Sequence, residues 1–99
     1  MNNTTKPQKS GSPGIEQIKQ LRAKAKLLEP MVRIGKNGLT PSVIEHIQKL
    51  IKKRKLVKIK LLKSFMEEND RKAASATLAQ ETGTEIIEQV GFVVVLYRR

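Results

Sequence analysis

Apolar residues recur every three or four positions in two segments of the chain. Residues 14–28 carry them on one helical face, and we predict a helix that ends before Pro30. That face contains Ile15, Ile18, Leu21, Ala25 and Leu28. A second helix is predicted to begin at Thr40-Pro41, because a hydroxyl N-cap followed by proline is typical of helix starts. Its buried stripe is expected to contain Val43, Ile44, Ile47, Leu50 and Ile51.

Alternation of apolar and polar residues over most of their length marks two strands. Residues 31–34 form a brief strand, with Val32 and Ile34 facing the same way. Residues 56–62 form a longer one, in which Val57, Ile59 and Leu61 face the core. Lys58 and Lys60 then lie on the opposite face. The alternation therefore predicts a strand with a basic outer face.

The C-terminal third of the chain is predicted to form a helix followed by a β-hairpin. Asn69 or Asp70 is expected to cap a third helix that stops at Gly83. Two β-rich runs, residues 84–90 and 92–97, flank Gly91 and predict the terminal hairpin.

The order of these elements predicts one small α/β domain. It is αβαβαββ, which implies a four-stranded mixed sheet packed with helices through right-handed crossovers. A chain of 99 residues suffices for one such domain. Residues 1–13 are polar and are expected to form a flexible basic tail, so the folded domain is predicted to span residues 14–99.

The net charge of the chain indicates a polyanionic partner for this domain. The chain has 20 Lys and Arg against 9 Asp and Glu, a net charge of +11 and a pI near 10.3. Residues 36–63 hold nine basic residues and one acid, Glu45, a net charge of +8. A lysine face that only maintains solubility is the ordinary alternative, but it would mix both signs. The one-sided charge favours nucleic acid.

Other features of the composition narrow the class of protein. No apolar run approaches the roughly 20 residues that a membrane-spanning helix needs, so no membrane partner is expected. The N-terminal residues lack the apolar stretch of a secretory signal, and we expect a cytoplasmic monomer. With no cysteine, disulfide and thiolate chemistry are excluded.

The turn Gly35-Lys36-Asn37-Gly38 is the candidate for contact with a phosphate backbone. It leads from a strand into a helix start, where backbone N–H groups can converge on an anion. Glycine permits close approach, Lys36 adds a cation, and Asn37 tolerates a left-handed conformation or can bond a sugar or base. The alternative is a tight connection that only needs positive φ at one or both glycines. The lysine within the turn and the basic segment after it favour the binding site.

Aromatic residues for base stacking are few. They are Phe65, Phe92 and Tyr97; Phe92 is expected in the core and Tyr97 is expected to be exposed. Contacts should therefore be dominated by phosphates, with low sequence selectivity.

An enzyme is not indicated. His46 and Asp70 are the only residues of their types, and nothing in their spacing suggests a catalytic pair. Glu67, Glu68 and Asp70 could hold a hard metal ion, but acids also suit a helix start. We expect no catalytic residue, metal or cofactor.

Four segments together resemble a known family. They are Val32–Thr40, Leu56–Lys60, Glu81-Thr82-Gly83 and Val94–Arg98. The sequence is similar, over roughly residues 15–98, to the CRM domain, also called the YhbY-like family. The resemblance implies a fold similar to the C-terminal domain of bacterial translation initiation factor 3. It also implies RNA bound through the glycine loop; stand-alone prokaryotic members are associated with precursors of the large ribosomal subunit.

We therefore expect RNA, either ribosomal RNA or a pre-ribosomal particle, as the partner. The predicted contact residues are Arg33, Gly35, Lys36, Asn37, Gly38, Lys49, Lys52, Lys53, Arg54, Lys55, Lys58 and Lys60. The alternative is a basic interaction module whose lysines dock on an acidic protein partner. A weaker alternative is membrane association through the first helix. It is weaker because the core requires the apolar residues of that helix.

Overall fold

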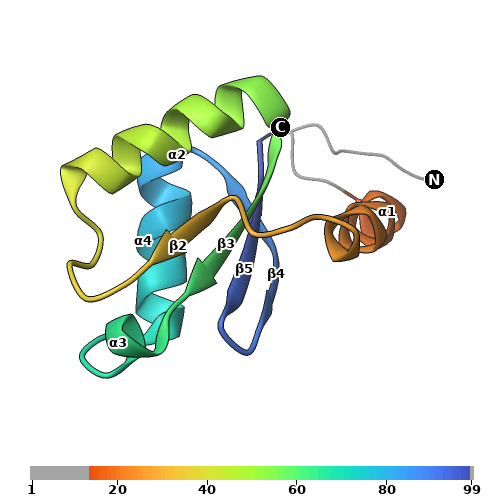
Figure 1. The fold of residues 1–99 in the computed structure, drawn as a ribbon. Coiled ribbons are helices and arrows are strands. Elements are labelled where there is room, and N and C mark those ends of the chain that lie inside the picture. Colours follow the sequence, from red (N-terminus) through yellow and green to blue (C-terminus); the bar gives the residue numbers. More distant parts are fainter. Residues whose placement is uncertain (1–13, 99) are drawn as a thin grey trace.

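The computed structural model describes residues 14–98 (Figure 1), so the predicted basic tail, residues 1–13, lies outside the described residues. The elements follow in the order α1 (Ile15–Lys26), β2 (Val32–Ile34), α2 (Pro41–Arg54), β3 (Leu56–Leu61), α3 (Lys63–Met66), α4 (Arg71–Thr82), β4 (Glu85–Val90) and β5 (Val93–Tyr97). Apart from the single-turn α3, this is the predicted αβαβαββ order.

The four strands form one mixed sheet in the order β2-β3-β5-β4. β2 and β3 are parallel and are joined by the α2 crossover, whereas β5 pairs antiparallel with both β3 and β4. The predicted α/β fold with a four-stranded mixed sheet is confirmed.

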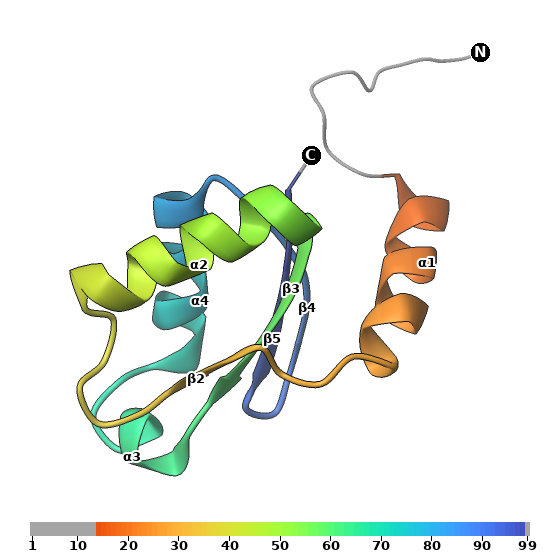
Figure 2. The same cartoon turned by 45° about the horizontal axis from the view of Figure 1, so that its top comes forward.

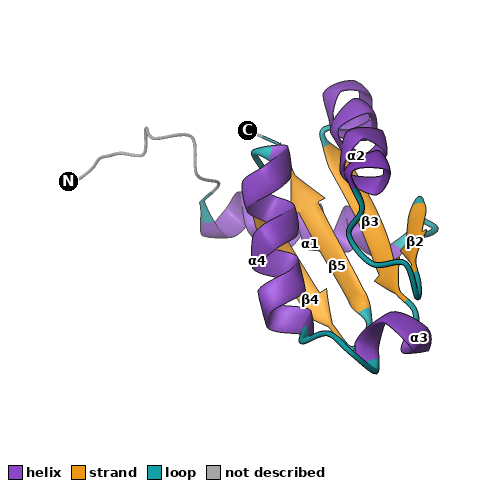
Figure 3. Ribbon diagram, turned by 90° about the vertical axis from the view of Figure 1, so that its left-hand side faces the viewer, coloured by secondary structure: helices purple, strands orange, loops and turns teal. Residues whose placement is uncertain are grey.

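Helices cover both faces of the sheet (Figures 2 and 3). α2 and α4 pack on one face, and α1 lies across the other. The larger core lies under α2 and α4 and includes Ile47, Ile59 and Leu78, all fully buried. A smaller cluster under α1 is built from Ala25, Leu56, Ile87 and Val95. α1 is therefore held by a smaller apolar contact than the helices opposite.

The predicted caps determine where the helices begin and end. Thr40 Oγ1 accepts a hydrogen bond from Val43 N at 3.2 Å, with Pro41 at the first helical position. Asp70 caps α4 by accepting from Ala73 N at 3.0 Å, and Gly83 ends that helix in the left-handed conformation. Both helices thus start where a side-chain oxygen satisfies an otherwise unpaired N–H.

Two residues that were expected to face the core are exposed. Phe92 is 45% exposed, because it occupies the turn between β4 and β5 and not a strand. Ile15 is 76% exposed, because α1 begins at this residue and its first turn extends past the apolar cluster. Within residues 14–98, no helix has the length and apolar character required to cross a membrane.

Candidate nucleic-acid interface

The glycine turn closes directly after β2. Gly38 N–H donates to Gly35 O at 3.0 Å, which makes a compact four-residue turn. Gly38 has φ +74°, a conformation that disfavours residues with a Cβ atom. Gly35 lies outside that region, and a Cβ atom there would meet Leu62 Cδ1 and Ser64 Oγ at 3.4 Å, an ordinary contact. Gly38 is therefore required by the turn itself, whereas Gly35 is not.

Several cations gather around this turn. Leu62 N–H donates to Ile34 O at 2.8 Å, so the carboxyl ends of the parallel strands β2 and β3 lie side by side. Lys36 in the turn and Lys63 at the start of α3 are both exposed at this end of the sheet. Lys63 is not among the predicted contact residues, since a four-residue helix gives no periodic signal in the sequence.

Arg33 and Lys60 extend this charge onto the face of the sheet that carries α1. They are cross-strand partners on β2 and β3, and both side chains are exposed. Adjacent strands lie about 4.8 Å apart. We call Arg33, Lys36, Lys60 and Lys63 the loop-end cluster.

The start of α2 offers fewer free donors than the sequence suggested. Pro41 has no N–H, and the Val43 N–H is already bonded to the Thr40 hydroxyl. Ser42 thus provides the remaining donor of the first three helical residues. The helix therefore has fewer N–H groups for an anion than expected, and the other predicted donors are those of the glycine turn.

The Lys58 ammonium is not open to solvent ligands, because α1 engages it. Its Nζ donates to Ala25 O at 3.1 Å and to Leu28 O at 3.0 Å, at the C-terminal end of α1. Carbonyl groups at a helix C-terminus lack partners within the helix and attract cations. Lys58 shares the face of Lys60, as predicted, but α1 covers it there. The half-buried Lys58 therefore joins α1 to β3 and is not an open cation like Lys60.

A second group of cations lies at the opposite end of α2. Lys49, Lys52, Lys53, Arg54 and Lys55 are all exposed, and Arg98 joins them because its N–H donates to Lys55 O at 2.7 Å. We call these six residues the helix-end cluster. The 14 residues of α2 span about 21 Å. Apart from Lys58, the predicted basic contact residues therefore fall into two regions toward opposite ends of α2, a helix that can be followed along its length in Figure 1.

The exposed aromatic ring is that of Phe92 and not that of Tyr97. Tyr97 is half-buried, and its hydroxyl accepts a hydrogen bond from Gln17 Nε2 at 3.1 Å. Phe92 O accepts from Leu61 N at 2.6 Å, which fixes this turn beside the carboxyl end of β3. Phe92 is exposed because the hairpin register ends β4 at Val90 and leaves Phe92 in the turn.

His46 and Asp70 lie at two different helices. His46 is exposed on α2, and Asp70 caps α4. Residues 14–98 contain no group of three or more His, Cys, Asp or Glu side chains that could hold a metal ion.

Comparison with known proteins gives a consistent picture. The sequence model of the CRS1/YhbY (CRM) domain matches residues 15–98. A protein of Methanocaldococcus jannaschii named as a probable RNA-binding protein is 36% identical over 80 residues, which are 81% of this chain and 59% of that protein. The chain thus matches about three-fifths of the length of this archaeal relative.

Similarity extends to bacterial proteins and to a solved structure. The probable RNA-binding protein YqeI of Bacillus subtilis is 28% identical over 83 residues, which are 84% of each chain. The solution structure of the protein SAV1595 from Staphylococcus aureus superimposes with a TM-score of 0.71 at 28% identity, over 85% of each chain.

Proposed function

The chain belongs to the CRS1/YhbY (CRM) domain family, and from this premise we propose that it binds RNA through the glycine turn and the loop-end cluster. Relatives in the archaeal and bacterial lineages carry the name of RNA-binding proteins and not of enzymes. These names, together with the family match, support RNA binding as the general function.

The pairing of Arg33 with Lys60 is the observation that carries the proposal. Two like charges directly opposite one another on a sheet destabilise it. A phosphate between them would convert this repulsion into two favourable contacts. Lys36 lies in the turn that directly follows β2, so the same backbone can pass from the sheet to the glycine turn.

The two cationic regions favour a folded RNA as the ligand. The helix-end cluster begins at Lys49 and continues past the C-terminal end of α2, which lies about 21 Å from the start of that helix. An RNA that engages both must present phosphates at that separation, as a structured RNA does. We propose, on the basis of the family, that this RNA is ribosomal RNA or a precursor of the large ribosomal subunit, and that the protein acts in ribosome assembly.

The test is a titration of fluorescent ribosomal RNA fragments with the wild type and Lys36→Glu at two salt concentrations. Lys19→Glu is the matched control, because it makes the same charge change at an exposed position on α1. Circular dichroism of all three proteins checks that they are folded. We expect Lys36→Glu to abolish fragment-selective binding, Lys19→Glu to weaken it by less than about threefold, and affinity to fall steeply with salt.

Equal and weak binding by wild type and Lys36→Glu would contradict the proposal. It would leave only a generic basic surface and would favour the alternative, in which the lysines dock on an acidic protein partner. That alternative predicts a partner that stays bound after ribonuclease treatment.

A further inference from the structure

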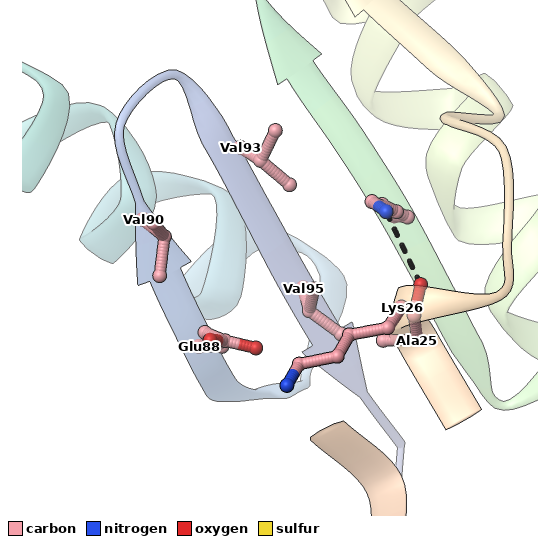
Figure 4. A pocket seen from close by; sticks show the side chains of 7 residues that line it. Ala25, Lys26, Glu88, Val90, Val93 and Val95 are labelled. Carbon is pink, nitrogen blue, oxygen red and sulfur yellow. Dashed lines mark hydrogen bonds between the residues drawn. The ribbon is translucent and has the colours of Figure 1, made fainter. Parts of the chain in front are cut away.

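An open pocket lies between the C-terminal end of α1 and the β4–β5 hairpin (Figure 4). Its volume is about 260 Å³, just below the roughly 300–1,000 Å³ of sites that enclose a whole small molecule. It is lined by Ala25, Lys26, Lys58, Glu88, Val90, Val93 and Val95. The pocket is thus mostly apolar and carries a few polar groups.

The polar side chains of the pocket differ in whether they already make hydrogen bonds or ion pairs. The Lys58 ammonium is held by the carbonyl groups of α1, and the dashed line in Figure 4 marks its bond to Ala25. Lys26 is exposed at the rim, on α1, and Glu88 enters from β4. Among residues 14–98, no hydrogen bond or ion pair engages the half-buried Glu88 carboxylate. Glu88 therefore retains its full capacity to accept hydrogen bonds.

A β-bulge places Glu88 in this pocket. The register of β4 against β5 shifts between Ile86, opposite Leu96, and Glu88, opposite Val95. Leu96 faces the core under α2 and α4, whereas Val95 faces α1. Regular alternation would put Ile86 and Glu88 on the same face. The extra residue, Ile87, moves the carboxylate to the face that carries α1.

The pocket continues the loop-end cluster across the sheet. Lys60 is opposite Val93 in the register, and Val93 is opposite Val90. With Arg33, these residues form one row: two cations followed by two valines. At about 4.8 Å per strand, Lys60 lies one strand and Arg33 two strands from Val93. A nucleotide whose phosphate contacts the cations can therefore direct its base toward the pocket.

We propose that this pocket receives an unpaired guanine of the RNA, with Glu88 as the residue that selects the base. This inference rests on the proposed function and names a part of the RNA that the same surface would recognise. The apolar wall of valines suits the face of a base, and the carboxylate suits its edge. Guanine presents two neighbouring donors, N1–H and N2–H, which one carboxylate accepts together.

The other bases fit this arrangement less well. Adenine and cytosine offer a single amino group beside a ring acceptor, and uracil places acceptors on both sides of its N3–H. Guanine also carries the acceptors O6 and N7 on another edge, which the Lys26 ammonium can approach. The opposite charges of Glu88 and Lys26 thus complement guanine best. The adjacent cations favour a nucleotide over an apolar peptide side chain as the occupant.

The test uses five fluorescent single-stranded RNA pentamers that differ only at the central base, which is guanine, adenine, cytosine, uracil or hypoxanthine. Hypoxanthine retains N1–H and lacks the N2 amino group. Each is titrated against wild type, Glu88→Gln, Lys26→Gln and Glu45→Gln. Glu45 lies exposed on α2, on the other side of the sheet, and is the control for the loss of one negative charge.

We expect wild type to prefer guanine by about tenfold, the order of one bidentate contact, and hypoxanthine to lose much of this preference. Glu88→Gln should reduce the ratio to about one, because an amide cannot accept from both donors. Lys26→Gln should reduce it partly, and Glu45→Gln should leave it unchanged. Circular dichroism and thermal melts check that all four proteins are folded.

Two results separate failure of this inference from failure of the proposed function. If the wild type binds all pentamers equally and Lys36→Glu still abolishes binding of the ribosomal fragments, the guanine pocket is overturned and RNA binding by the glycine turn stands. A guanine preference that persists in Glu88→Gln also overturns the pocket. If neither a pentamer nor a ribosomal fragment binds the wild type, both proposals are overturned.

Discussion

Arg33 and Lys60 lie directly opposite one another on the parallel strands β2 and β3, with both side chains exposed on the face that carries α1. Cross-strand neighbours interact strongly enough that like charges at such positions reduce stability. We therefore expect the free protein to carry a local electrostatic cost at the place where we propose that phosphate binds.

This cost predicts that Lys60→Gln stabilises the protein while it weakens RNA binding. The free energy of unfolding should rise by about 0.2–1 kcal/mol at low salt. The gain should shrink as salt screens the pair. Urea denaturation at two ionic strengths measures it, and RNA affinity is measured in parallel. In an Arg33→Gln background the same substitution should bring no gain, since the repulsion is already gone. An equal gain in both backgrounds would mean that the two charges do not interact.

The two glycines of the turn should respond differently to alanine. Gly38→Ala must hold a Cβ atom at φ +74° and should cost about 1–2 kcal/mol of stability. Gly35→Ala has space for the methyl group, so stability should change by less than about 0.5 kcal/mol while RNA affinity falls, because the added methyl group keeps the phosphate away. Thermal melts and RNA titrations of both variants separate the two effects. Unchanged affinity in a folded Gly35→Ala would show that the backbone there does not approach phosphate.

Lys58→Met should loosen α1 and not remove a phosphate contact. The substitution deletes hydrogen bonds to the carbonyl groups of Ala25 and Leu28, and charged donors of this kind contribute about 1–3 kcal/mol. Amide hydrogen exchange should accelerate in α1, while the salt dependence of RNA binding keeps its slope. Lys60→Gln provides the comparison, with unchanged exchange and a slope lower by about one. Unchanged hydrogen exchange in α1 together with a lower salt slope for Lys58→Met would instead indicate that Lys58 contacts RNA.

Lys55 ends α2 in the left-handed conformation, with φ 63°, where glycine is the usual residue. Lys55→Gly should therefore stabilise the protein by about 1 kcal/mol, although it also removes a cation of the helix-end cluster. The matched variant Lys53→Gly removes the same charge within the helix and should destabilise by about 1 kcal/mol. Chemical denaturation of both variants checks the opposite signs. Destabilisation by both would mean that Lys55 makes contacts that outweigh its backbone strain.

Most of the fold could be predicted from the sequence, because local signals and burial patterns agree. Thr40-Pro41 and Asp70 mark helix starts, Gly83 and Gly91 mark the reversals, and the alternation in residues 56–62 predicts β3. The helical crossovers predicted a mixed sheet, whereas its strand order, β2-β3-β5-β4, was not predicted. α3 escaped prediction, since one turn of helix leaves no repeating pattern.

The site was harder to predict because it depends on what packs against each strand. Lys58 and Lys60 occupy equivalent positions in the alternation, yet α1 covers only the former. The glycine turn and the helix-end cluster are close in sequence, but they lie toward opposite ends of α2. Glu88 gave no signal, because a bulge and not a motif sets the direction of its side chain.

Both edges of the sheet are poor templates for another strand. β2 has only three residues, with an exposed arginine at its centre, and β4 is interrupted by its bulge. Short, charged or irregular edges oppose the edge-to-edge pairing that leads to aggregation. They also disfavour partners that bind by adding a strand of their own. A domain with these two sheet edges can thus reach high concentrations without its sheets joining into fibres.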